Sequence, residues 1–266
     1  MNQSERRSYL IRRLLDERAD FRGAEIPQGE DGQRQLLRGL MNVRRPAPAD
    51  ADFLRVQDEY LQALREEKGV VTLSEIAFDS EGLGLWRGDI TRLAVDAIVN
   101  AANSGMTGCY VPNHTCIDNC IHSFAGLQLR LDCDTLMRAQ GYEEPTGRAK
   151  ITPGYNLPAR YVLHTVGPII EDAVTAEDER LLASCYRSCL KLAAENGLES
   201  VAFCGISTGV FRFPKHRAAE IAVATVRGEL KKQTSVKKVV FTVFSAQSEQ
   251  IYREILGRAP GTVPPV

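Results

Sequence analysis

Hydrophobic residues recur along this chain with two different periods, and the change falls near residue 70. Before that point, apolar residues return every three or four positions, which is typical of amphipathic helices. They form three stripes, at Leu10, Leu14 and Leu15; at Leu36, Leu37, Leu40 and Met41; and at Phe53, Val56, Tyr60, Leu61 and Leu64. Asp50 or Asp52 can cap the third helix, and Gly69 can end it. We therefore expect residues 1–69 to form an N-terminal helical extension that packs on the rest of the chain.

From Val70 onward, short apolar runs alternate with longer stretches of helical period. Strands are expected at residues 83–91, 95–100, 160–166, 200–206 and 237–244, and helices at residues 117–140, 177–196, 215–232 and 249–256. This alternation predicts an α/β fold in which three layers, α/β/α, are built around a mostly parallel sheet. The second unit covers residues 70–258 and leaves a C-terminal tail at residues 259–266.

Ligands of such folds bind beyond the carboxyl ends of the strands. The loops at residues 88–90, 100–116 and 207–214 are therefore the candidate ligand loops. The third loop reads S-T-G-V-F-R-F-P and opens a helix. Gly209 permits a positive φ or a close backbone approach, and the amides near a helix N-terminus can hold a phosphate.

The charge balance narrows the choice of partners. The chain has 33 Lys and Arg residues against 34 Asp and Glu residues, which gives a net charge of −1. This balance lacks the excess of positive charge that indicates a nucleic-acid or membrane partner. The seven cysteines are an odd number, and neither a signal peptide after Met1 nor a long apolar run is present in the sequence. These features indicate a reducing, cytoplasmic location, where cysteines serve metal binding, catalysis or core packing rather than disulfides.

The densest candidate chemistry lies in the segment C-Y-V-P-N-H-T-C-I-D-N-C-I-H, which runs from Cys109 to His122. Cys109, His114 and Cys116 offer soft sulfur and nitrogen ligands of the kind that Zn²⁺ takes. Their spacing, C-x4-H-x-C, is not that of a zinc finger, and three protein ligands with one open position describe a catalytic zinc. The alternative is that these cysteines are simply small buried hydrophobes.

Cys120 has two interpretations. It is either a fourth ligand, which would close the metal site, or a core residue of the helix that follows. If that helix begins near Ile117, then Ile117, Cys120, Ile121 and Phe124 lie on one apolar face. We favour the core position.

Several motifs together resemble the macrodomain, an ADP-ribose-binding module. They are G-D-I-T at residues 88–91, D-A-I-V-N-A-A-N-S at 96–104, C-I-H-x-x-A-G at 120–126, Y-V-L-H-T-V-G-P at 161–168 and S-T-G-V-F at 207–211. The resemblance runs from about residue 73 to residue 256 and implies a macrodomain fold with a mixed central sheet. Where common macrodomains carry a glycine-rich loop, this chain has G-C-Y-V-P-N-H-T-C-I-D-N.

That segment resembles the zinc-containing subgroup of bacterial and fungal macrodomains. Members of this subgroup carry a helical N-terminal extension and remove ADP-ribose from proteins. Some bacterial members are encoded beside a sirtuin-type ADP-ribosyltransferase and a lipoylated carrier protein. The resemblance therefore implies Zn²⁺ as cofactor and ADP-ribose and mono-ADP-ribosylated protein as partners, with a lipoylated carrier protein as one possible substrate.

The resemblance also implies roles for single residues. At the adenine end, Asp89 would accept from the exocyclic amine, the Ile90 amide would serve the ring, and Phe244 would stack on it. For Asp89 the alternative is a turn or helix cap, and for Phe244 it is a core position. The backbone of Ser207, Thr208, Gly209, Val210 and Phe211 would wrap the diphosphate. Arg212 departs from the glycine that macrodomains commonly have there.

At the other end of the ligand, Asn103 would hydrogen-bond the distal ribose, and Asp118 would lie beside the scissile bond. The alternative for Asn103 is that it only satisfies the backbone. We read His122 and His164 as structural.

The function expected from these residues is a zinc-dependent ADP-ribosyl hydrolase, with Asp118 and Asn103 as the catalytic pair. The bond cleaved would join C1″ of the distal ribose to a carboxylate of Asp or Glu in the modified protein. Two alternatives remain, a reader that binds ADP-ribose without turning it over and a hydrolase of O-acetyl-ADP-ribose.

Overall fold

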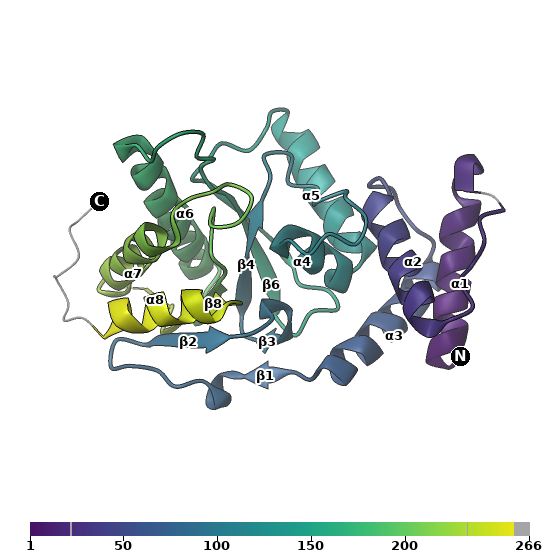
Figure 1. Cartoon of the computed structure of the whole chain (residues 1–266), viewed down its shortest axis with the longest axis horizontal. Coiled ribbons are helices and arrows are strands. Elements are labelled where there is room, and N and C mark those ends of the chain that lie inside the picture. The colour runs from purple at the N-terminus through teal and green to yellow at the C-terminus, as the bar shows by residue number, and fades with distance from the viewer. Residues whose placement is uncertain (22, 233, 258–266) are drawn as a thin grey trace.

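A six-stranded sheet forms the centre of the larger part of the molecule (Figure 1). The computed structural model describes residues 1–21, 23–232 and 234–257. Across the sheet the strands follow the order β2 (Leu83–Arg87), β8 (Lys238–Val243), β7 (Ser200–Phe203), β4 (Ala97–Ala102), β6 (Tyr161–Val166) and β5 (Ala149–Pro153). Neighbouring strands are parallel except β5, which is antiparallel to β6. The sheet is therefore mixed, with its one antiparallel strand at an edge.

The strands are apolar because helices cover the sheet on both faces. Ala97, Ile98 and Val99 of β4 are fully buried. Helices α6 (Ala176–Glu195), α7 (Lys215–Leu230) and α8 (Ala246–Leu256) pack together on one side, and α4 (Ile117–Ala125) and α5 (Leu127–Gln140) lie on the other (Figure 1). This is the three-layer α/β/α fold that the sequence predicted.

The prediction of a single helix at residues 117–140 is wrong in one respect, because Gly126 divides this segment into α4 and α5. Gly126 has φ 106° and ψ 177°, a conformation that essentially only glycine adopts. The amide of Leu127 donates to Gln57 Oε1 at 2.9 Å instead of continuing the helix. Two smaller features were not predicted, the edge strand β5 and a pair of short parallel strands, β1 (Val71–Thr72) and β3 (Leu93–Ala94).

The N-terminal segment folds into three helices, α1 (Gln3–Asp16), α2 (Glu30–Val43) and α3 (Ala51–Lys68), which lie at one end of the molecule beside α4 and α5 (Figure 1). Asp50 caps α3 by accepting from the Phe53 amide at 2.9 Å. The residues of the predicted stripes are buried in a separate apolar cluster, apart from Leu36 and Leu64, which are partly buried; Leu127 of α5 also belongs to this cluster. The predicted tail at 259–266 lies outside the described residues. No helix among the described residues is long and apolar enough to span a membrane.

Candidate functional site

Four loops lie close together at the carboxyl ends of the strands, because β2, β8, β7 and β4 are parallel neighbours. Each loop carries a residue that the sequence singled out. Asp89 follows β2, Asn103 follows β4, Ser207 lies beyond β7, and Phe244 follows β8. The fold therefore brings both ends of the expected ligand site to the carboxyl edge of one sheet.

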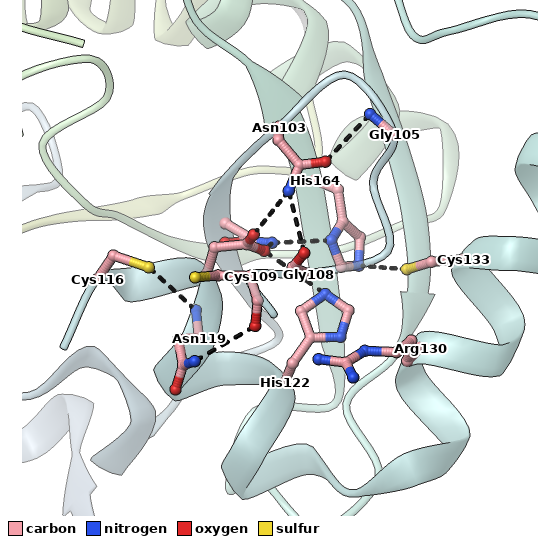
Figure 2. Close-up of polar contacts among 12 residues, drawn as sticks. Asn103, Gly105, Gly108, Cys109, Cys116, Asn119, His122, Arg130, Cys133 and His164 are labelled. Atoms are coloured by element: carbon pink, nitrogen blue, oxygen red, sulfur yellow. Dashed lines mark hydrogen bonds and ion pairs between the residues drawn. The ribbon is translucent and has the colours of Figure 1, made fainter. Parts of the chain in front are cut away.

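The thiol and imidazole groups of Cys109, His114 and Cys116 converge in the loop between β4 and α4. Their ligand atoms all lie within 4.8 Å of one another, and Cys109 Sγ is 3.6 Å from His114 Nδ1. Cys116 is the N-cap of α4, and its Sγ accepts from the Asn119 amide at 3.4 Å (Figure 2). Burial, with a contribution from the neighbouring Cys109, raises the pKa of Cys116 to about 12. Two thiols and one imidazole suit Zn²⁺, and three protein donors leave room for a fourth ligand.

Backbone geometry at two positions gives this loop its shape. Gly108 has φ 85°, and a Cβ there would lie 2.8 Å from Cγ of His122, so the residue before Cys109 must be glycine. Asn113 also has a positive φ, 56°. The side-chain amide of Asn119 donates to the carbonyls of Cys109 and Val111, at 3.3 and 2.9 Å, and so ties the start of the loop to α4.

Cys120 is not part of this group of ligands. The core position that we favoured is also only partly right, because Cys120 is half-buried and its Sγ lies 3.5 Å from Nη2 of Arg38 in α2. The sequence could not show this contact, since it comes from the extension.

Asp118 is a carboxylate buried in the floor of the site, 5% exposed. Asn100 Nδ2 donates to its Oδ1 at 2.8 Å, and Asn103 Nδ2 donates to its Oδ2 at 3.2 Å. Burial raises the pKa of Asp118 to about 6, although hydrogen bonds from the two amides act in the opposite direction. Asn103 Nδ2 also donates to the carbonyl of Gly108 at 3.1 Å (Figure 2). Asn103 thereby links Asp118 to the metal loop, the loop that carries Cys109, His114 and Cys116.

The structure thus brings together Asn103 and Asp118, the two residues expected to be catalytic. Asn100 was missed by the sequence analysis, although an amide inside a buried strand was a signal that could have found it. Asn100 is fully buried, so its side chain needs polar partners inside the protein.

A second group of possible ligands, His122, Cys133 and His164, is buried behind Asp118. His164 uses both ring nitrogens, because Nδ1 lies 3.1 Å from Asn100 Nδ2 and Nε2 lies 2.9 Å from Thr152 Oγ1. Burial lowers its pKa to about 3, so the ring is neutral. Both ring nitrogens of His164 therefore have hydrogen-bond partners within the protein, as expected for a histidine with a structural role.

Asp89 caps the short 3₁₀ helix at Ile90–Arg92, so the alternative of a helix cap is realised. Its Oδ1 accepts from the amide and the hydroxyl of Thr91, at 3.0 and 2.7 Å. Its Oδ2 lies 2.7 Å from the ammonium of Lys68, the last residue of α3. Burial raises the pKa of Asp89, but the hydrogen bonds from Lys68 and Thr91 outweigh it and hold the pKa below its usual range.

In the loop after β7, the first of the two roles expected of Gly209 is wrong, because its φ is not positive. The positive φ angles fall instead at Ser207 (62°) and Arg212 (61°). Arg212 therefore adopts the left-handed backbone for which glycine is favoured, and its side chain is exposed. The loop closes through the Phe213 amide, which donates to the Ser207 carbonyl at 2.9 Å.

Two apolar side chains beside these loops are open to solvent. Phe244 is 86% exposed and Val210 is 73% exposed. The alternative of a core position for Phe244 is therefore wrong. An exposed aromatic ring at the end of a central strand is available to stack on a flat ligand.

Comparison with known proteins agrees with this geometry. The model of the Macro domain family matches residues 99–222. The chain is 57% identical to a protein from Treponema medium named protein-ADP-ribose hydrolase, over 96% of this chain and 100% of that one. It is 49% identical to a protein of the same name from Staphylococcus aureus strain MSSA476, over 95% and 96% of the two chains. Among solved structures, a Trypanosoma brucei macrodomain in complex with ADP-ribose is 32% identical, with a TM-score of 0.63 over 83% of this chain and 95% of that one.

Proposed function

The chain belongs to the macrodomain family and is a hydrolase, and we propose that it removes mono-ADP-ribose from modified proteins with the help of a zinc ion. The observation that carries the proposal is a hydrogen-bonded link between two groups. Asn103 Nδ2 donates both to the buried carboxylate of Asp118 and to the carbonyl of Gly108, the residue before the first of the soft ligands Cys109, His114 and Cys116. A module that only binds ADP-ribose has no need of a buried acid beside three metal ligands.

The two residues of the catalytic pair have separate tasks. Asn103 would accept from a hydroxyl of the distal ribose through its Oδ1, while its Nδ2 keeps Oδ2 of Asp118 aligned. Asp118 orients the attacking water and accepts its proton, because a carboxylate fixed by two donors keeps its remaining lone pairs in a constant direction. Zinc, when bound by the three ligands, would supply a Lewis acid that polarises an oxygen or lowers the pKa of water.

The rest of the ligand would lie across the carboxyl ends of the parallel strands. Asp89 and the amide of Ile90 would hold the adenine, and Phe244 would stack on it. The backbone of residues 207–211 would wrap the diphosphate. The bond cleaved would join C1″ of the distal ribose to an Asp or Glu carboxylate of the modified protein. A lipoylated carrier protein is one candidate substrate. The reaction would take place in the cytoplasm.

A time course with mono-ADP-ribosylated protein tests the proposal. The enzyme should release ADP-ribose, lose activity in the presence of a chelator and recover it when zinc is returned. Modified proteins linked through carboxylate, serine or arginine would be compared, and O-acetyl-ADP-ribose would be run in parallel. Binding of ADP-ribose without turnover of any substrate would falsify the proposal and identify a reader.

Asp118→Asn is the matched variant for this assay. It keeps the shape of the side chain but cannot accept a proton, so turnover should fall by about 10²- to 10⁴-fold. Zinc content, measured by elemental analysis, should not change, because Asp118 is assigned to water and not to the ion. Full activity of this variant would remove Asp118 from the reaction.

A further inference from the structure

Helix α2 of the extension lies against the loop that carries the candidate metal ligands. The guanidinium of Arg38 makes the first set of contacts through its Nη2. This atom donates to the carbonyl of His114 at 2.7 Å and to Oδ1 of Asn119 at 2.9 Å. The carbonyl belongs to one of the three candidate ligands, so Arg38 fixes the backbone of His114 directly.

Arg38 also acts on the other end of the loop, through Asn119. The amide of Asn119 that accepts from Arg38 donates through its Nδ2 to the carbonyls of Cys109 and Val111. Asn119 therefore lies between Arg38 and Cys109 in one chain of hydrogen bonds. Since a guanidinium donor forms stronger hydrogen bonds than a neutral one, this chain restrains both Cys109 and His114.

Asn42, one turn further along α2, makes the second set of contacts. Its Oδ1 accepts from the amide of Asn113 at 2.9 Å, and its Nδ2 donates to Ser123 Oγ of α4 at 2.8 Å. Asn113 has a positive φ and directly precedes His114, so its backbone needs an external restraint more than an ordinary residue does. Asn42 is 1% exposed, and both its polar atoms are used.

Helix α2 also comes close to the loop at Gly39, between Arg38 and Asn42. A Cβ at Gly39 would lie 3.4 Å from Asn113 Nδ2 and 3.7 Å from Pro112 Cβ, which are ordinary van der Waals distances to side-chain atoms. The contact between α2 and the loop is therefore continuous from Arg38 to Asn42.

We propose that Arg38 and Asn42 are positioning residues of the metal centre, so that helix α2 of the extension is part of that centre. The inference rests on the proposed function, since it needs the three ligands to bind zinc. The inference goes beyond the proposed function because it assigns the extension a role in holding the ion. Groups that orient metal ligands from outside typically change metal affinity by about 10- to 100-fold when they are removed.

The experiment measures the zinc affinity of the full-length protein by competition with a chromophoric chelator. Arg38→Met keeps the apolar part of the side chain and removes the donors, and it should weaken zinc binding by about 10- to 100-fold. Arg38→Lys keeps the charge but supplies a single ammonium, and it should have an intermediate affinity. Asn42→Ala should also weaken binding and should speed hydrogen exchange at the Asn113 amide.

Gln62→Ala is the matched control. Gln62 donates to Asn156 Oδ1 at 3.2 Å, a contact between α3 and the macrodomain that does not involve the metal loop. This variant should keep the zinc affinity of the unchanged protein, even if its melting temperature falls slightly. A similar loss of affinity in Gln62→Ala would show that general loosening of the extension, and not positioning by α2, is responsible.

Two outcomes separate this inference from the proposed function. If the unchanged protein binds no zinc and hydrolyses without it, the proposed metal centre is wrong and this inference fails with it. If the unchanged protein binds zinc and needs it, but a folded Arg38→Met variant binds zinc equally well, only the role of Arg38 is overturned. If a folded Asn42→Ala variant also binds zinc as tightly as the unchanged protein, the role of Asn42 is overturned as well.

Discussion

Asp118 is a carboxyl group that water barely reaches, and two side-chain amides replace the hydration it has lost. Burial favours the neutral acid, while donors from Asn100 and Asn103 favour the carboxylate. The opposition of these effects is typical of functional groups, because a protein that needs only stability avoids a buried carboxylate. Asn103 donates to both Asp118 and the carbonyl of Gly108, so it links the buried carboxylate to the metal loop.

Asp89 shows how one carboxylate serves both the fold and a ligand. Its Oδ1 accepts twice from Thr91 and its Oδ2 once from Lys68, which leaves one acceptor direction for an adenine amine. We expect Asp89→Ala to weaken ADP-ribose binding by about 1.5–3 kcal/mol, the range for a hydrogen bond to a charged group. Isothermal titration calorimetry would measure the change.

Lys68→Ala is the control for this substitution. It breaks the same ion pair between the extension and the ligand loop but keeps the carboxylate that we assign to adenine. Its effect on ADP-ribose affinity should be smaller than that of Asp89→Ala. Equal losses would show that the ion pair, and not the contact with adenine, accounts for the effect of Asp89.

At the scale of elements, the break between α4 and α5 is the feature that joins the extension to the macrodomain. Gly126 turns the chain, and Gln57 of α3 accepts from the Leu127 amide that the turn leaves without a helical partner. Periodicity could not predict the break, since apolar spacing continues through residues 117–140. The glycine was visible in the sequence, but its partner Gln57 lies about seventy positions earlier.

Gly126→Ala should be strongly destabilising. The new Cβ would lie 2.7 Å from Gln57 Nε2, in a conformation with φ 106° that L residues rarely adopt. We expect a loss of about 1–3 kcal/mol from backbone strain and a similar loss from the clash, measured by denaturant unfolding.

Gly141→Ala is the comparison for this measurement. Gly141 also has a positive φ, 80°, but a Cβ there would meet nothing within 4 Å. It should lose only about 1–2 kcal/mol, the cost of the left-handed backbone. Equal losses at the two positions would mean that the contact with Gln57 contributes nothing.

At the scale of the whole molecule, the sequence predicted the layers and the positions of the ligand loops, because hydrophobic period and strand order determine them. It also identified Cys109, His114 and Cys116, whose atoms the fold brings together as local spacing suggested. It could not predict the contacts of Arg38, Asn42 or Lys68 with the site. These contacts depend on how the extension docks, and a helix with one apolar stripe does not show which polar residues will meet a neighbour.

Deletion of residues 1–68 tests this view of the whole molecule. The truncation would uncover Leu127, and it would remove Met41, Asn42 and Arg44, whose carbonyls accept from Nη1 of the buried Arg130 at 3.2, 2.6 and 2.7 Å. An uncovered apolar face favours aggregation, and the loss of three hydrogen bonds to a charged donor removes stability from the remaining chain. We therefore expect an insoluble protein, or a soluble one that melts at a lower temperature and binds zinc more weakly. Calorimetry and elemental analysis of the truncated protein would check both properties. A truncated chain with the melting temperature and zinc content of the full protein would show that the extension is an independent module.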